Sequence, residues 1–347
     1  MSQETLSVPS QTPSGAPTPA VALIGCGRWG RNIARALAGL GALKVVADPA
    51  TELAGPVARD LGVEAVADPA AVLARPDIEA VAIAAPAAGH ARLVQAALAA
   101  GKHVFVEKPL ALTLADAEAC AEAARAARLT LMVGHLLQYH PAFLRLVRAV
   151  EAGTIGAVRH VSSHRLNPGA IRTEETALFS LAPHDVSMVL RLCGAEPDRV
   201  SAMSASISRA GVPDAYWANL SFGDAVTAHI QVSWLSPFKE HKLTVLGDAG
   251  ALVFEDTAPA ERKLVLYRDP VDRSGAAPAY RKSDGEAVAY DAAEPLKAEM
   301  AWFLDAVRGR HAPRTGPEEA IPVLAVLRRI EDAAARPAAA AAEREAA

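Results

Sequence analysis

Short apolar runs alternate with helix-length segments through the first part of the chain, and this alternation constrains the fold more than any other feature. The apolar runs occupy residues 20–24, 43–47, 80–85, 103–106 and 129–134. The segments between them, at 28–40, 51–61, 88–100 and 113–127, have the residue spacing of helices. Strands and helices in this order predict βαβ units and a parallel sheet with helices on both faces.

The second part of the chain has a different pattern. Closely spaced runs of alternating polarity occupy 158–166, 199–208, 216–222 and 225–235, with a hairpin-like turn at Gly223-Asp224. Helices are expected at 183–193, 294–309 and 317–335, whereas 256–290 is hard to place. The predicted fold class is α/β: a parallel doubly wound sheet, then an α+β domain with a mostly antiparallel, open-faced sheet. The predicted divisions are a disordered tail at 1–19, domains at 20–140 and 141–335, and an Ala-rich tail at 336–347.

The composition excludes several classes of protein. The length of 347 residues suits two domains, and the 51% of hydrophobic residues can form a sizeable core. A net charge of −4 offers no basic surplus for nucleic acid, no apolar run approaches the about 20 residues that span a membrane, and the first residues are not a secretory signal. The three cysteines, Cys26, Cys120 and Cys193, have neither metal-ligand nor disulfide spacing, so we expect no metal site and a cytoplasmic location.

A glycine motif follows the first apolar run and opens the first expected helix. It reads Gly25-Cys26-Gly27-Arg28-Trp29-Gly30, the G-x-G-x-x-G pattern in the strand-turn-helix context that dinucleotide binding requires. The first glycine allows the tight turn, the second lets the backbone approach a pyrophosphate, and the third allows close packing of helix on strand. The alternative is a glycine-rich turn without a ligand.

Asp48 ends the second apolar run, 23 residues after Gly25. A carboxylate at this place can accept hydrogen bonds from the ribose hydroxyls of the adenosine half, and it would repel a 2′-phosphate. No arginine immediately follows it, so the expected cofactor is NAD, with NADP less favoured. Asp48 could instead be an ordinary residue of an Asp-Pro turn.

Residues 103–109, HVFVEKP, place a lysine where an apolar run ends. Lys108 then lies at the carboxyl end of a strand, on the side of the sheet where ligands bind. A lysine in a partly desolvated site releases its proton more readily, so it can serve as an acid or base toward a substrate hydroxyl. Glu107 can hold or tune it, and Pro109 fixes the turn; the alternative is a surface turn.

The chain at this point resembles the Gfo/Idh/MocA family, the glucose–fructose oxidoreductase and inositol dehydrogenase group. The resemblance rests on GCGRWGRN, on AAPAAGHARLVQAALAAGKHVFVEKPLALTLADAE and on VGH at 133–135, and it covers about residues 20–330. It implies a Rossmann domain, a second domain whose open sheet often serves oligomerisation, and a tightly held nicotinamide cofactor. The likeness makes Lys108 the catalytic lysine, implies a cis Lys108–Pro109 bond, and places Pro86 and His90 beside the nicotinamide.

The predicted cofactor site therefore comprises Gly25, Gly27, Arg28, Trp29, Gly30, Asp48, Pro86, His90 and Glu107.

A second catalytic residue is expected at His184, in the segment FSLAPHD (179–185). Pro183 suits the first turn of a helix that ends near Gly194, and the positive end of that helix disfavours a protonated imidazole. A neutral His184 can accept a proton or bind a substrate hydroxyl. The family pattern here is D-x-x-x-H, but Ser180 occupies the aspartate position, so Lys108 is the stronger candidate for acid/base work; His184 could also be a helix-capping polar residue.

The segments 164–185 and 133–143 look most like family members from nucleotide-sugar pathways, which act at C3 of a sugar joined to UDP or dTDP. Arg165, Asn167 and Arg172 could contact hydroxyls or phosphates, or they could be ordinary polar residues of a sheet and loop. The resemblance places His135 and Tyr139 at the rim of the active site, although His135 could also be a satisfied interdomain residue.

The predicted function is hydride transfer between NAD and a sugar hydroxyl or ketone, with C3 of a UDP-N-acetyl amino sugar as the favoured substrate. A homo-oligomer formed through the second sheet is expected. Two alternatives stay open: the same chemistry on inositol or another free sugar, and a regulator that binds the dinucleotide without catalysis.

Overall fold

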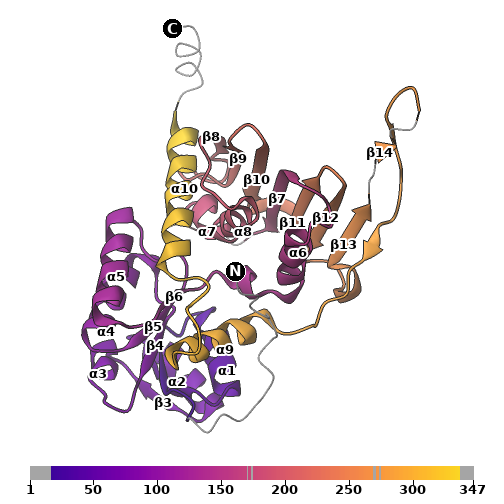
Figure 1. The fold of residues 1–347 in the computed structure, drawn as a ribbon. Coiled ribbons are helices and arrows are strands. Elements are labelled where there is room, and N and C mark those ends of the chain that lie inside the picture. Colours follow the sequence, from indigo (N-terminus) through magenta and orange to yellow (C-terminus); the bar gives the residue numbers. More distant parts are fainter. Residues whose placement is uncertain (1–16, 170, 173–174, 269–270, 273–274, 337–347) are drawn as a thin grey trace. The chain divides into compact units, whose positions relative to one another are not determined.

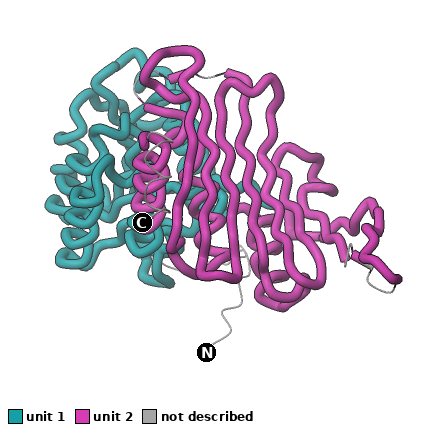
Figure 2. The backbone as a smooth tube through the Cα atoms, turned by 90° about the horizontal axis from the view of Figure 1, so that it is seen from above, with its two compact units in different colours: residues 1–139, 293–321 teal, residues 140–292, 322–347 magenta. Residues whose placement is uncertain are grey.

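The computed structural model describes residues 17–169, 171–172, 175–268, 271–272 and 275–336. The chain divides into two compact units, which Figure 2 draws in different colours. Unit 1 comprises residues 1–139 and 293–321, and unit 2 comprises 140–292 and 322–347. The predicted tails lie outside the described residues, apart from residues 17–19 and 336.

Unit 1 contains a six-stranded sheet whose strands all run parallel, in the order β3-β2-β1-β4-β5-β6. The strands are β1 (Val21–Ile24), β2 (Leu43–Ala47), β3 (Glu64–Val66), β4 (Ala80–Ile83), β5 (His103–Val106) and β6 (Leu131–Val133). β1 and β4 are buried at every residue, because helices cover both faces of such a sheet. The parallel sheet expected from the sequence is confirmed, and short β3 is an addition to it.

The helices of unit 1 pack in two groups. They are α1 (Gly30–Gly39), α2 (Thr51–Leu61), α3 (Pro69–Leu73), α4 (His90–Ala99), α5 (Leu114–Ala127) and α9 (Pro295–Val307), with 3₁₀ turns η1 (Ala87–Gly89) and η2 (Leu136–Tyr139). α1 packs beside α2 and α9, while α4 packs beside α5 (Figure 1). Right-handed crossovers in a 3-2-1-4-5 strand order place these groups on opposite faces.

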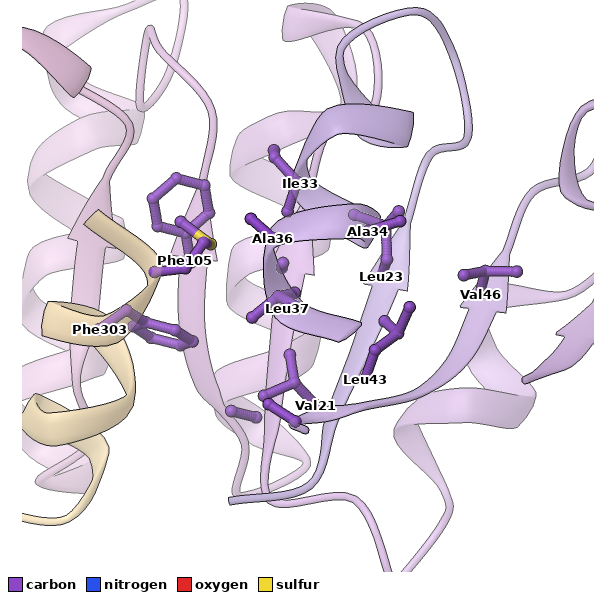
Figure 3. Packing of buried hydrophobic residues seen from close by; sticks show 14 of the residues in the cluster. Val21, Leu23, Ile33, Ala34, Ala36, Leu37, Leu43, Val46, Phe105 and Phe303 are labelled. Atoms are coloured by element: carbon purple, nitrogen blue, oxygen red, sulfur yellow. The ribbon is translucent and has the colours of Figure 1, made fainter. Parts of the chain in front are cut away.

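The core of unit 1 shows why α9 belongs to it. Figure 3 shows Phe303 of α9 beside Phe105 of β5, on the side of the sheet where Ile33 and Leu37 of α1 also lie. The two phenyl rings have their centroids 5.9 Å apart, and Phe303 is fully buried. The sequence prediction assigned the helix at 294–309 to the second domain, because its spacing indicates an apolar face but not the partner of that face.

Unit 2 contains an eight-stranded sheet in the order β16-β13-β12-β11-β7-β10-β9-β8. The strands are β7 (Val158–Pro168), β8 (Arg199–Ala205), β9 (Ala215–Phe222), β10 (Val226–Ser233), β11 (Leu235–Gly247), β12 (Gly250–Glu255), β13 (Leu264–Arg268) and β16 (Glu286–Ala287). Among the strand pairs that the described residues form in this sheet, only β7–β10 is parallel, so the mostly antiparallel sheet expected from the sequence is confirmed. A separate pair, β14 (Val271–Asp272) and β15 (Ala279–Tyr280), lies within the segment that was hard to place.

One face of this sheet is covered and the other is polar. α6 (Pro141–Glu151), α7 (Ala177–Leu181) and α8 (Pro183–Cys193) pack against strands β7, β9, β10, β12 and β13. Along β10, Ala228, Ile230 and Val232 are buried, whereas Thr227 and His229 alternate with them on the open face. α10 (Pro317–Ala335) begins in unit 1 and continues into unit 2 from Pro322.

The described helices include none that is long and apolar enough to cross a membrane.

Candidate active site

The three glycines of the loop before α1 have three different surroundings. Gly25 has φ +101°, and a Cβ there would lie 2.5 Å from the carbonyl oxygen of Ala84. A Cβ on Gly30 would lie 2.0 Å from the carbonyl oxygen of Gly25, whereas a Cβ on Gly27 would have no atom of the chain within 4 Å. The outer glycines therefore serve packing, and the middle one keeps an open approach to the backbone beside the first turn of α1. This is the cradle that a pyrophosphate requires, so the loop fits a dinucleotide.

Asp48 is tied to this loop by hydrogen bonds. Its Oδ2 accepts from the backbone N–H of Cys26 at 2.7 Å, and its Oδ1 accepts from the N–H of Ala50 at 2.9 Å. A carboxylate has about four acceptor positions, so two remain for the ribose hydroxyls of a bound nucleotide. Asp48 thus positions the loop in addition to the ribose contact that its sequence position predicts.

Trp29 connects the glycine loop to the lysine turn. Its indole Nε1–H donates to Oε1 of Glu107 at 2.5 Å, and Oε2 of Glu107 accepts from the backbone N–H of Lys108 at 3.3 Å. Burial raises the pKa of Glu107, and the neighbouring Lys108 opposes that rise. Gly134 gives Glu107 its space, because a Cβ at that position would lie 2.9 Å from Oε1.

Lys108 lies two residues beyond the end of β5 and is half-buried. Its peptide bond to Pro109 is cis, as the resemblance implied. His90 holds this turn: its Nδ1 lies 2.7 Å from the carbonyl oxygen of Pro109 and its Nε2 lies 2.8 Å from that of Ala85, next to Pro86. Burial lowers the pKa of His90, and the two neighbouring carbonyl oxygens oppose that shift. His90 thus lies between the backbone at Ala85 and the backbone at Pro109, and in its neutral form its single N–H donates to one of the two carbonyl oxygens.

A buried acid that sequence analysis missed lies near this turn. Glu299 of α9 is fully buried, and neither of its carboxylate oxygens has a hydrogen-bond partner among the described residues. Burial, together with the charge of Glu107, raises its pKa well above the ordinary value. A carboxyl group in such surroundings is held in the neutral form. Its signal in the sequence is a glutamate that lies, with Lys297, inside the otherwise apolar stretch 296–304.

His135 and Tyr139 are held within unit 1. Nδ1 of His135 lies 2.6 Å from Oε2 of Glu319, a partner that is distant in sequence. Tyr139 is buried in the core, and its hydroxyl lies 3.0 Å from that of Thr315. Burial raises the pKa of Tyr139 above its ordinary range. The guanidinium of Arg314 lies over its ring, 5.3 Å from the centroid.

Unit 2 places a buried ion pair beside His184, the second residue of α8. Asp185 accepts from Nε of Arg165 at 2.7 Å and from the hydroxyl of Ser163 at 2.6 Å. Nη1 of Arg165 lies 3.4 Å from Nδ1 of His241, whose pKa burial and then Arg165 lower to about 3. The guanidinium of Arg165 is therefore committed to Asp185 and a neutral imidazole.

The other residues predicted for unit 2 divide into two groups. Asn167 joins the Arg165 network, because its Oδ1 lies 3.1 Å from Nε2 of His241. Arg172 does not join it; it is exposed and pairs with Glu175 at 3.2 Å. Ser180, in the expected aspartate position, is on α7. The described residues form no cluster of three or more histidines, cysteines and carboxylates that could hold a metal ion.

Comparison with known proteins agrees with this geometry. Residues 20–135 match the model "Oxidoreductase family, NAD-binding Rossmann fold", and 143–253 match the "GFO/IDH/MocA C-terminal domain". The chain is 31% identical over 250 residues to inositol 2-dehydrogenase of Rhizobium meliloti, an alignment that spans 68% of this chain and 76% of that one. The chain belongs to the Gfo/Idh/MocA family of NAD-binding oxidoreductases.

Two further comparisons point to one particular relative. UDP-N-acetylglucosamine 3-dehydrogenase of Acidithiobacillus ferrooxidans is 31% identical over 182 residues, which is 52% of this chain and only 56% of that protein. A solved structure of the same enzyme superposes with a TM-score of 0.80 at 27% identity, covering 90% of this chain and 96% of that one. The fold is therefore shared over nearly the whole length, while the sequence similarity is strongest over part of it.

Proposed function

We propose that the protein oxidises a sugar hydroxyl, or reduces the corresponding ketone, with Lys108 as the acid/base residue. The observation that carries this proposal is the position of Lys108: it is half-buried at the end of β5, and the Trp29–Glu107 hydrogen bond connects its turn to the glycine loop. When bound, the nicotinamide accepts or donates the hydride. Asp48 and the backbone of Gly27 are the groups that would hold the dinucleotide, and we propose NAD as the usual form.

Residues of the protein accept and donate the proton of the substrate hydroxyl. In the oxidising direction Lys108 takes the proton of the substrate hydroxyl, and in the reducing direction it returns a proton to the new alkoxide. We also propose His184, at the positive end of α8, as a neutral imidazole that can form a hydrogen bond with a substrate hydroxyl. His90 keeps the Pro109 turn in place, and Glu107 accepts the backbone N–H of Lys108 and so helps to fix the lysine turn.

The favoured substrate is a nucleotide-linked sugar, in particular C3 of a UDP-N-acetyl amino sugar. The likeness to UDP-N-acetylglucosamine 3-dehydrogenase supports it. A second candidate is inositol or another free polyol, which the likeness to inositol 2-dehydrogenase supports. The ion pair of Arg165 with Asp185 also favours this candidate, because a guanidinium already paired with a carboxylate is less available to a diphosphate.

Cofactor reduction, followed by absorbance, tests both substrates. The protein is mixed with NAD and a panel of UDP-sugars, dTDP-sugars and free polyols, with a 2-oxo acid added in parallel to recycle a bound cofactor. We expect turnover with one class, and a loss of about 10²- to 10⁴-fold in Lys108→Ala. The control is Lys297→Ala, an exposed lysine of α9, which should retain full activity.

The same panel separates catalysis from regulation. Lys108→Ala that still binds NAD but turns nothing over supports the assigned role, while full activity of that variant overturns it. Tight NAD binding by the native protein without turnover on any substrate would favour a dinucleotide-binding regulator.

We also propose a homo-oligomer formed through the open face of the unit 2 sheet, in the cytoplasm. The polar and half-buried side chains of β7 and β10 on that face support an interface of mixed character, and Cys26, Cys120 and Cys193 are free thiols. Sedimentation velocity measures the oligomeric state directly, and a monomer at all concentrations would contradict the interface.

A further inference from the structure

Two carboxyl groups of unit 1 lie close enough for the charge of one to act on the other. Glu107 directly follows β5, and Glu299 belongs to α9, which packs in the core of the same unit. Phe303, one helical turn after Glu299, lies beside Phe105, two residues before Glu107 (Figure 3). The charge of Glu107 contributes to the raised pKa of Glu299. The two side chains therefore form a carboxyl pair.

The members of this pair differ in burial and in hydrogen bonds. Glu107 is half-buried and accepts N–H groups of Trp29 and Lys108. Glu299 is 0% exposed, and along the part of the chain that the structure describes, neither of its oxygens has a hydrogen-bond partner. N–H donors favour a charged carboxylate, whereas burial without donors favours the neutral acid. Glu107 is therefore the first of the two to ionise, and Glu299 holds the last proton of the pair.

The surroundings of Glu299 are mostly apolar. The buried face of α1, which packs beside α9, has only apolar residues and glycine, and burial raises the pKa of Cys26 in the same core to about 11. Burial also raises the pKa of Tyr139, so both of these groups stay neutral. The charged or titratable groups near the pair are Lys108, His135, Glu319 and Arg314.

The charge of the expected cofactor changes during the proposed reaction. The oxidised nicotinamide ring carries one positive charge, and the ring that has accepted a hydride is neutral. Glu107 lies at the carboxyl end of β5, the side on which a parallel sheet binds its ligand, so the charge of the ring acts on the pair. A nearby opposite charge lowers the pKa of a carboxyl group by about 1 to 3 pH units. The oxidised ring therefore favours loss of the proton, and the reduced ring favours its return.

We propose that Glu299 and Glu107 form a proton-holding pair, which releases a proton when the oxidised dinucleotide binds and regains one when the nicotinamide is reduced. This inference rests on the dinucleotide site of the proposed function and adds Glu299 to it as a positioning residue that acts through Glu107. In the oxidising direction the substrate carbon gives a hydride to the ring, and the hydroxyl proton goes to Lys108. Lys108 passes that proton to the pair and becomes a neutral base again. Reduction of a ketone reverses each transfer.

Calorimetric titration counts the proton without any turnover. The native protein is titrated with NAD and with NADH, which differ only in the redox state of the nicotinamide, between about pH 7 and about pH 9. Buffers of different ionisation enthalpy convert the measured heat into the number of protons released. We expect NAD to release about 0.3 to 1 proton more than NADH, with the largest difference between the pKa of the free pair and that of the NAD-bound pair.

Variants locate the proton. Glu299→Gln should show no difference between NAD and NADH, because an amide does not ionise, and thermal melting confirms that it is folded. The matched control is Glu318→Gln, an exposed glutamate in the first turn of α10, which should keep the native difference. Lys108→Ala should also keep a difference, since the proton belongs to the carboxyl pair.

Infrared difference spectroscopy gives a second measurement on the native protein. Addition of NAD should remove part of the carbonyl absorption of a protonated carboxylic acid, and addition of NADH should not. This change should be absent in Glu299→Gln.

Three outcomes overturn the inference alone: equal proton release with NAD and NADH, a difference that survives in Glu299→Gln, or a difference that disappears in Lys108→Ala. None of these results affects the proposed hydride transfer. Binding of neither dinucleotide overturns the dinucleotide site itself, and with it the proposed function.

Discussion

The two sheets of this protein use their side chains in different ways. The six-stranded sheet of unit 1 is buried on both faces, so β1 and β4 have no exposed residue. The eight-stranded sheet of unit 2 alternates, with buried residues facing helices and polar residues on the open face, as β10 shows. In β1 and β4 every residue is apolar, so the polar groups near these strands lie in the turns that follow them. In the eight-stranded sheet of unit 2, polar residues occur along whole strands, so a polar residue there does not by itself indicate a functional site.

The largest expected effect of a substitution is on the stability of unit 1, through close packing beside its six-stranded sheet. Gly30→Ala should destabilise unit 1 by more than about 3 kcal/mol, because the Cβ would lie 2.0 Å from a backbone oxygen, and the gain in helix propensity of about 1 kcal/mol is smaller. Gly27→Ala, with no neighbour within 4 Å, should leave stability unchanged and weaken dinucleotide binding. Urea unfolding and NADH titration of both variants measure these effects. Equal stabilities would show that the loop can relax.

The next largest effect on stability is expected from substitutions on the two faces of β10. Ile230→Ala should cost about 3 kcal/mol, since this side chain is 2% exposed and faces the helices. His229→Ala, one residue earlier on the open face, should change the stability of a monomer by about 0.5 kcal/mol or less. Urea unfolding at low protein concentration gives both values. If His229→Ala becomes costly only at high protein concentration, the open face is covered by a second copy.

A smaller effect is expected at Asp214, which precedes β9. It is fully buried, and its Oδ1 accepts from the indole N–H of Trp234 at 2.5 Å and from the hydroxyl of Ser208 at 2.6 Å. Its Oδ2 accepts backbone N–H groups of Ile207 and Ser208, both at 2.7 Å. Burial alone would raise the pKa of Asp214, but these hydrogen bonds outweigh it and lower the pKa to about 2.

Asp214→Asn should therefore cost about 2 kcal/mol at pH 6, because an amide NH₂ replaces one acceptor oxygen. A lowered folded pKa gives stability that is present above the unfolded value of 3.8 and lost as pH falls through about 2. The difference between native protein and variant should accordingly shrink toward pH 2. A constant difference across this range would contradict the assigned charge.

The smallest expected effect is an increase in stability. Glu299 has a folded pKa above its ordinary 4.5, so above pH 4.5 the unfolded chain loses a proton that the folded protein keeps. Stability is then greatest below 4.5 and falls with rising pH, by about 1.4 kcal/mol per pH unit, until the folded pKa is reached. Glu299→Gln removes this loss and should be more stable than the native protein by about 1 kcal/mol or more at pH 7.

Unfolding midpoints at pH 4.5, 6 and 7 measure the Glu299 effect, with exposed Glu318→Gln as the control. A variant that is less stable at pH 7 would mean that Glu299 is charged and paired in the folded protein.

The sequence predicted the features of this molecule that depend on residues close to one another in the chain. Strand-helix alternation identified the parallel sheet, and Gly25, Gly30 and Pro183 have the surroundings that their positions in a turn and a helix require. Short elements such as β3, α3 and α7 were missed, because three to five residues carry too little periodicity.

Pairings across long distances in sequence were not predictable. The bonds between Trp29 and Glu107, His135 and Glu319, and Arg165 and Asp185 each depend on how elements pack. Residue type suggested that Arg165 could contact a phosphate, but its pairing with Asp185 determines whether its guanidinium is available to a ligand.

The different duties of the three loop glycines also limit how this protein can evolve. Any side chain at Gly25 or Gly30 would collide with the backbone, and Cys26 is buried. Few substitutions at these three positions are therefore compatible with the fold. Arg28 and Trp29 are exposed, and Gly27 has free space around it. Heritable change in dinucleotide binding is therefore expected at Gly27 and Arg28, where substitutions do not disturb buried packing.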